Sequence, residues 1–137
     1  MEIIIEFISS LLMMLPPSGE ELLAAVSDAT CQALREAEIR LPPDVIAALR
    51  HAAENETSDI AREELGRILE NISLAGRLGV PICQDTGVPV VYLTIPPGIP
   101  LTAGLLEAVA DGVRKATHDI PLRPNAVHPL KRQNSGD

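Results

Sequence analysis

Aromatic residues are nearly absent from this chain of 137 residues, which holds Phe7, Tyr92 and no Trp. Its core must therefore be built from Leu, Ile, Val and Ala. A nucleic-acid surface of the stacking type needs exposed aromatic rings. The net charge of −8 also disfavours nonspecific attraction to a phosphate backbone. We therefore expect no nucleic-acid partner.

Cysteine is also scarce, because the chain holds only Cys31 and Cys83, which lie far apart and form no CxxC pattern. This argues against a secreted disulfide scaffold and favours a reducing compartment, the cytoplasm. Hydrophobic residues make up 46% of the chain and charged residues 22%, which is typical of a globular protein and excludes intrinsic disorder. The length predicts one domain with a core of its own.

Residues 1–17 form an apolar N-terminal segment. The apolar run is shorter than the roughly 20 residues of a membrane span and is interrupted by Glu2 and Glu6, so we expect no membrane partner. It has no basic region that would mark a signal peptide. We expect a strand or helix that packs on the rest of the chain. A misassigned start is the alternative, because Met13 and Met14 lie just before a clear helix start.

Three helices are predicted between residues 18 and 79. Ser18 and Glu21 have the spacing of a capping box, Pro43 suits the first turn of a second helix, and Ser58 suits the cap of a third. Gly79 is a suitable C-terminal stop. The predicted inward stripes are Leu22, Val26, Ala29, Ala33 and Ala37; Val45, Ile46, Leu49, Ala52 and Ala53; and Ala61, Leu65, Ile68, Ile72 and Ala75. On the opposite face of the third helix, Arg62, Glu63, Arg67, Glu70 and Asn71 are expected to form a solvated surface.

The pattern changes after Gly79, where residues 79–87 are rich in turn formers and residues 88–95 predict a strand with Pro89 at its start or edge. Thr102 is predicted to cap a fourth helix that ends near residue 120 and turns Leu105, Leu106, Val109 and Val113 inward. The predicted fold class is α+β (mixed): a mainly helical N-terminal half, followed by a strand and helix of a larger mixed sheet.

Charge is unevenly distributed along the chain. Residues 1–110 hold 6 basic and 16 acidic groups, whereas residues 111–137 hold 5 basic and 3 acidic groups. The C-terminal segment therefore suits an anion. The alternative is a basic loop that offsets an acidic body.

Cys83 is the most informative residue for function, because it lies in a polar, kinked loop between a helix and a strand, where proteins often present functional groups. Cys31, within a helical stripe, is expected to be a small buried hydrophobe. Three roles for Cys83 remain open. It could be a nucleophile, although no His lies nearby in sequence; half of a zinc site, although a close second ligand is missing; or one of several widely spaced cluster cysteines.

Two segments of the chain resemble a known family. Residues 81–87, PICQDTG, are similar to the first cluster-ligand motif of the class I, iron–sulfur-dependent fumarate hydratases and the related L-tartrate dehydratase alpha subunits. Downstream, RPNAV at residues 123–127, Pro129-Leu130 and NSGD at residues 134–137 resemble the second segment of that family, in the expected order. The resemblance covers residues 18–137.

The resemblance implies a [4Fe–4S] cluster held by three Cys thiolates, with one iron left open as a Lewis acid. Cys83 would be one metal ligand, and the remaining cysteine ligands would lie outside this chain. Gln84 and Asp85 would line the substrate pocket, where Asp85 would also act catalytically by assisting proton transfer. Arg123 would bind a substrate carboxylate, because its planar fork suits a bidentate contact.

By the same resemblance, residues 18–137 are the N-terminal part of an alpha-type catalytic domain, truncated at residue 137. The expected reaction is the reversible dehydration of a small dicarboxylate, malate to fumarate. The expected partners are a beta subunit or C-terminal domain, with an oligomer at full length, and we expect the isolated chain to be inactive. The alternatives are an L-tartrate dehydratase alpha subunit, a non-catalytic helical assembly module and, less favoured, a cysteine-nucleophile hydrolase.

Overall fold

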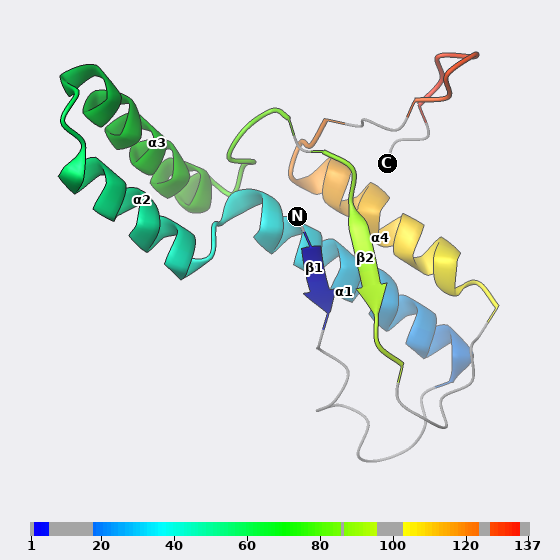
Figure 1. The fold of residues 1–137 in the computed structure, drawn as a ribbon. Coiled ribbons are helices and arrows are strands. Elements are labelled where there is room, and N and C mark those ends of the chain that lie inside the picture. The colour runs from blue at the N-terminus through cyan, green and yellow to red at the C-terminus, as the bar shows by residue number, and fades with distance from the viewer. Residues whose placement is uncertain (1, 6–17, 86, 96–102, 124–126, 135–137) are drawn as a thin grey trace.

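The computed structural model describes residues 2–5, 18–85, 87–95, 103–123 and 127–134. Helices make up most of this part of the chain (Figure 1), and three of them follow one another between residues 19 and 78, which confirms the predicted mainly helical N-terminal half. The elements, in chain order, are β1 (Glu2–Ile5), α1 (Gly19–Ile39), α2 (Pro43–Asn55), α3 (Asp59–Leu78), β2 (Val90–Leu93) and α4 (Leu105–Asp119).

Local sequence explains where the first three helices begin and end. At the start of α1, the Glu21 amide donates to Ser18 Oγ (3.3 Å) and the Ser18 amide donates to Glu21 Oε2 (2.8 Å), which completes the predicted capping box. Pro43 opens α2. Ser58 caps α3, and Gly79 ends it in the left-handed conformation (φ 67°) that glycine adopts without steric cost.

The two strands pair in parallel, with Glu2 opposite Val90 and Ile5 opposite Leu93. A strand at residues 2–5 is one of the two forms predicted for the N-terminal segment, while residues 6–17 lie outside the described residues. The strand β2 is shorter than the predicted 88–95, and Pro89 precedes it. Within the described ranges the sheet has two strands, so the predicted larger mixed sheet is not confirmed.

The close packing of α1 against α4 forms the centre of the molecule (Figure 1). At their crossing, a β-carbon added to Gly112 would lie 2.4 Å from the backbone oxygen of Ser27 and 2.6 Å from Thr30 Cβ. Glycine therefore lets the two backbones approach each other. The buried hydroxyl of Thr30 donates to the backbone oxygen of Val26 (2.8 Å), so it carries no unpaired donor into this interface.

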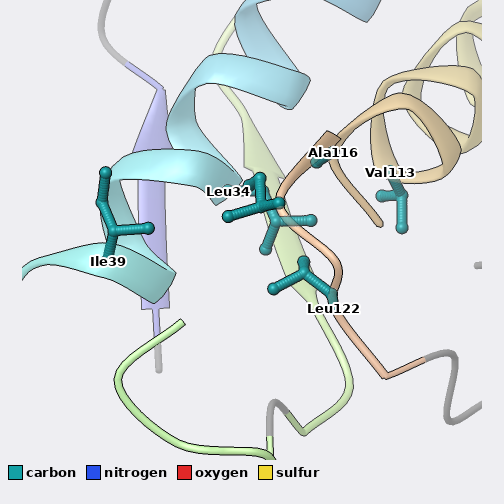
Figure 2. Close-up of a cluster of buried hydrophobic side chains, with 6 residues drawn as sticks. Leu34, Ile39, Val113, Ala116 and Leu122 are labelled. Carbon is teal, nitrogen blue, oxygen red and sulfur yellow. The ribbon is translucent and has the colours of Figure 1, made fainter. Parts of the chain in front are cut away.

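One hydrophobic cluster lies between the C-terminal half of α1, the second half of α4 and the segment that follows α4 (Figure 2). Cys31 packs against this cluster, as expected, but it is half-buried and not fully buried. Burial raises the pKa of the Cys31 thiol, so its uncharged form is favoured. The buried members are Leu34, Ile39, Val113, Ala116, Ile120 and Leu122.

The predicted N-terminal half of α4 was wrong in two respects. The helix begins at Leu105 after Gly104, while Thr102, the predicted cap, lies outside the described residues. Leu106, predicted to face inward, is 83% exposed. Val113 is buried as predicted, Leu105 and Val109 are half-buried, and the other buried residues of α4 are Ala108, Gly112 and Ala116. A close helix crossing selects small residues, so the bulkier Leu106 points away from α1.

Candidate functional site

The loop that carries Cys83 begins at the C-terminal end of α3. The amides of Gly79 and Val80 both donate to the backbone oxygen of Ala75, at 2.8 and 3.2 Å, and turn the chain away from the helix axis. Residues 80–82 are half-buried, whereas Cys83, Gln84 and Asp85 are exposed. The three residues of the predicted motif are therefore presented together on the surface.

Two hydrogen bonds hold Ile82, the residue directly before Cys83. Its amide donates to the backbone oxygen of Glu38 in the last turn of α1 (3.0 Å). Its carbonyl oxygen accepts from Asn71 Nδ2 on α3 (2.7 Å). The loop is thus attached to both helices immediately before its functional residues.

Asn71 is exposed, as predicted for its face of α3, but the prediction missed its hydrogen bond to Ile82. Asn71 lies 11 residues before Ile82 in sequence, and nothing in the local pattern distinguishes it from its charged neighbours on α3. The prediction also holds for Arg67, which pairs with Glu63 (2.6 Å) and Glu64 (3.2 Å) along the exposed face of the same helix.

The side chain of Cys83 lies at the start of a tight turn. Its Sγ donates to the backbone oxygen of Asp85 (3.6 Å), a weak sulfur hydrogen bond that spans the Cys-Gln-Asp segment. The thiol is free and exposed, unlike that of Cys31, which packs against the core. The Cys83 thiol is therefore accessible to a ligand at the surface, and Cys83 is not part of the hydrophobic cluster.

Arg123 is anchored through the residue before it. Leu122 is buried in the hydrophobic cluster that includes Ile39, and its amide donates to the backbone oxygen of Thr117 (3.0 Å). The segment that leads to Cys83 is thus hydrogen-bonded to the last turn of α1, whereas the segment that leads to Arg123 packs in a cluster to which α1 contributes Leu34 and Ile39. Arg123 itself is exposed. Residues 124–126 and 135–137 of the second predicted motif lie outside the described residues.

Residues 127–134 form a short hairpin-like turn, closed by an antiparallel bridge between Val127 and Asn134. Within it, His128 Nδ1 accepts from the amides of Leu130 (3.2 Å) and Lys131 (3.3 Å). Because Nδ1 is an acceptor, the proton of the neutral imidazole lies on Nε2. The side chain of His128 therefore stabilises the turn.

Two basic residues of the C-terminal segment that lie on α4 form ion pairs. Lys115 pairs with Asp28 (2.9 Å) and joins α4 to α1, while Arg114 pairs with Glu107 (2.8 Å) and Asp111 on its own helix. The hydrogen bond to Asp28 raises the pKa of Lys115. These two charges thus serve the helices. The basic residues beyond α4, namely Arg123, Lys131 and Arg132, are exposed.

The sequence places the chain in a family. Residues 27–137 match the family described as fumarate hydratase (Fumerase), a range that includes Cys83 and Arg123. The chain belongs to the fumarate hydratase family. The resemblance found in the two sequence motifs is therefore confirmed, while β1 lies outside the matched range.

Several curated proteins are similar to this fumarate hydratase family chain. The "Putative L(+)-tartrate dehydratase subunit alpha" of Methanocaldococcus jannaschii is 46% identical over 111 residues, which cover 80% of this chain and 39% of that protein. The "Putative fumarate hydratase class I" of Geobacillus stearothermophilus is 38% identical, over 77% of this chain and 21% of its own length. The L(+)-tartrate dehydratase subunit alpha of Escherichia coli K12 is 32% identical, over 71% and 32%. The chain thus spans between about a fifth and two-fifths of these relatives.

Two further observations concern metal binding and membrane-spanning helices in the described residues. In this part of the fumarate hydratase family chain, no three His, Cys, Asp or Glu side chains gather closely enough to hold a metal ion. Among the described helices, none is both long and apolar enough to cross a membrane.

Proposed function

We propose that this chain is the N-terminal part of a hydro-lyase catalytic domain. The proposed reaction is the reversible dehydration of a 2-hydroxy dicarboxylate, with malate converted to fumarate. The observation that carries the proposal is the exposed Cys83-Gln84-Asp85 turn, attached at Ile82 to α1 and α3, in a chain of the fumarate hydratase family. The alternative substrate is L-tartrate, because the relatives at 46% and 32% identity are named as tartrate dehydratase alpha subunits.

The chemistry of Cys83 suits a ligand of an iron–sulfur cluster. Cys83 presents an exposed sulfur that makes a weak hydrogen bond to the Asp85 backbone oxygen, and a thiolate is the soft ligand that cluster iron requires. We assign Cys83 as one ligand of a [4Fe–4S] cluster whose other cysteine ligands lie outside this chain. When bound, such a cluster supplies a Lewis-acidic iron that weakens the bond to the departing hydroxyl group.

The chain's own residues would bind the substrate and move its proton. The guanidinium of Arg123 offers two parallel N–H donors to a substrate carboxylate. The Gln84 amide can donate to a substrate oxygen, and the Asp85 carboxylate can hold the proton exchanged with the substrate carbon. Support comes from the exposure of all three side chains and from the packing of the segment before Arg123 in a cluster that also includes residues of the C-terminal half of α1, the helix that binds Ile82.

The proposed partners follow from surfaces that the described chain leaves open. An isolated pair of strands is marginally stable, and on β2 the side chains of Val90 and Tyr92 are 48% and 50% exposed. We propose that β2 joins a larger mixed sheet in a longer protein, which also associates with a beta subunit or C-terminal domain and forms an oligomer. The two free cysteines agree with a cytoplasmic location.

Anaerobic reconstitution of the longer protein with its beta partner tests the proposal. We expect turnover of malate and fumarate by this assembly, and none by the 137-residue chain above a Cys83→Ala control. Faster turnover of L-tartrate than of malate would establish the alternative substrate. An iron-loaded assembly that dehydrates neither substrate would contradict the hydro-lyase assignment.

A further inference from the structure

We propose that Asn71 is a positioning residue for the Cys83-Gln84-Asp85 turn. It touches no predicted substrate or cluster group. Its side chain instead joins the middle of α3 to the carbonyl of the residue before Cys83 (2.7 Å). The expected effect of Asn71 on catalysis rests on the proposed function. The effect of Asn71 on the loop can be measured without that function.

The geometry of Ile82 explains why this bond orients the turn. The Ile82 amide belongs to one peptide plane and is held by Glu38, whereas its carbonyl belongs to the next plane and is held by Asn71. The φ and ψ torsions of Ile82 lie between these two planes, so the pair of bonds restrains both. The direction in which the chain enters Cys83 is thereby set by two helices, not by the loop itself.

The part of α3 that carries Asn71 packs against the rest of the chain. The next residue, Ile72, and Ala75 are the buried residues of α3. Gly76 lies close to the backbone of Ile39, because a β-carbon added to the glycine would lie 3.7 Å from the Ile39 oxygen. The two anchors of Ile82 therefore belong to helices that contact each other. Glu38 contributes a backbone oxygen, so Asn71 is the anchor that a substitution can remove.

Replacing Asn71 with Ala in the full 137-residue chain tests the inference. The Ile82 amide should exchange its hydrogen about three- to tenfold faster, the change that corresponds to one ordinary hydrogen bond, and backbone order parameters of Cys83, Gln84 and Asp85 should fall. The Val80 amide, bonded to Ala75 within the end of α3, and the Leu122 amide should exchange at unchanged rates. Asn71→Gln keeps a donor and should restore slow exchange at Ile82.

Asn55→Ala is the matched control. Asn55 also uses its side-chain amide to bind a backbone carbonyl, that of His51 (2.8 Å), but on its own helix α2. This variant should leave the Ile82 rate unchanged. An unchanged Ile82 rate in Asn71→Ala would overturn the inference. So would a rate increase shared equally by Val80 and Leu122, because that result would indicate general destabilisation.

A second measurement separates the inference from the proposed function. In the reconstituted longer protein, Asn71→Ala should lower the visible absorbance of the cluster per chain, while Asn55→Ala should not. If the wild-type assembly binds no cluster but Asn71→Ala still loosens Ile82 in the chain alone, the proposed function fails and the positioning role stands. A loosened loop with cluster absorbance equal to wild type would overturn the role of Asn71 in placing Cys83.

Discussion

The pair α1–α4 and the pair α2–α3 are built on different principles. The first is packed closely around Gly112 and a buried cluster, whereas α2 has no buried residue and α3 leaves Ile60 and Leu78 77% and 64% exposed. The stability of the described chain should therefore reside mainly in α1–α4. The proposed site depends on both pairs, because Ile82 is attached to α1 by its amide and to α3 by its carbonyl.

The largest expected effect separates the two cysteines: Cys31 lies on α1 beside the hydrophobic cluster, and Cys83 lies in the loop that follows α3. In the reconstituted longer protein, Cys83→Ser should abolish cluster assembly, because a serine hydroxyl is a poor substitute for a thiolate ligand. Cys31→Ser, against the α1–α4 core, should cost only about 1 kcal/mol of stability. Iron and sulfide content per chain measures cluster loading in both variants, and Cys31→Ser should match wild type. Equal cluster loading in Cys83→Ser and wild type would remove the ligand assignment.

Truncation of leucines tests where stability resides. Leu34→Ala, in the buried cluster, should lower the free energy of unfolding by about 2–5 kcal/mol, because it removes buried methyl groups and leaves a cavity. Leu78→Ala, at the exposed end of α3, should change it by less than about 0.5 kcal/mol. Urea unfolding of the 137-residue chain gives both values. Similar losses in the two variants would show that the two helix pairs contribute alike.

Adding one methyl group to a helical glycine should have opposite effects in the two pairs. Gly112→Ala should destabilise the chain by about 1–3 kcal/mol, since the new β-carbon would overlap the Ser27 oxygen and Thr30. Gly66→Ala, on α3 with no atom near the added carbon, should stabilise it by about 0.5–1 kcal/mol through helix propensity. Thermal unfolding compares them. A stabilising Gly112→Ala would refute the close crossing of α1 and α4.

The smallest expected effect concerns the carboxyl group at the end of α1. Burial raises the pKa of Glu38 above its usual 4.5, so the folded state binds this proton more tightly than the unfolded state does. Below pH 4.5 the Glu38 carboxyl group is protonated in both states, so it costs the folded state least stability there. The cost grows as the pH rises through the raised pKa, because the folded state must then bury a charged carboxylate.

Glu38→Gln removes this penalty while keeping the backbone oxygen that binds Ile82. The variant should be more stable than wild type at pH 7, and the advantage should shrink at pH 4. Melting temperatures at the two pH values measure the difference. An advantage of the same size at both would show that the charge of Glu38 is not responsible.

Much of the local structure could be predicted from short sequence patterns. The capping box of Ser18 and Glu21, the proline start of α2 and the glycine end of α3 each depend on groups within four residues of one another. The motif around Cys83 could be identified in the same way, because its seven residues are contiguous. In both cases the relevant interactions or chemistry lie along one short stretch of chain.

The inward face of α4 and the anchor of the Cys83 loop were decided only by tertiary structure. Apolar spacing favoured Leu106 as a core residue, but the approach of α1 at Gly112 turned the small-residue face inward. Asn71 has no neighbour in sequence that marks it, because its acceptor, Ile82, comes 11 residues later, after the end of α3. The sequence alone determined the helices and the identity of the motif, since these depend on near neighbours. Packing determined which helix faces meet and how Cys83 is held, since those depend on residues that only folding brings together.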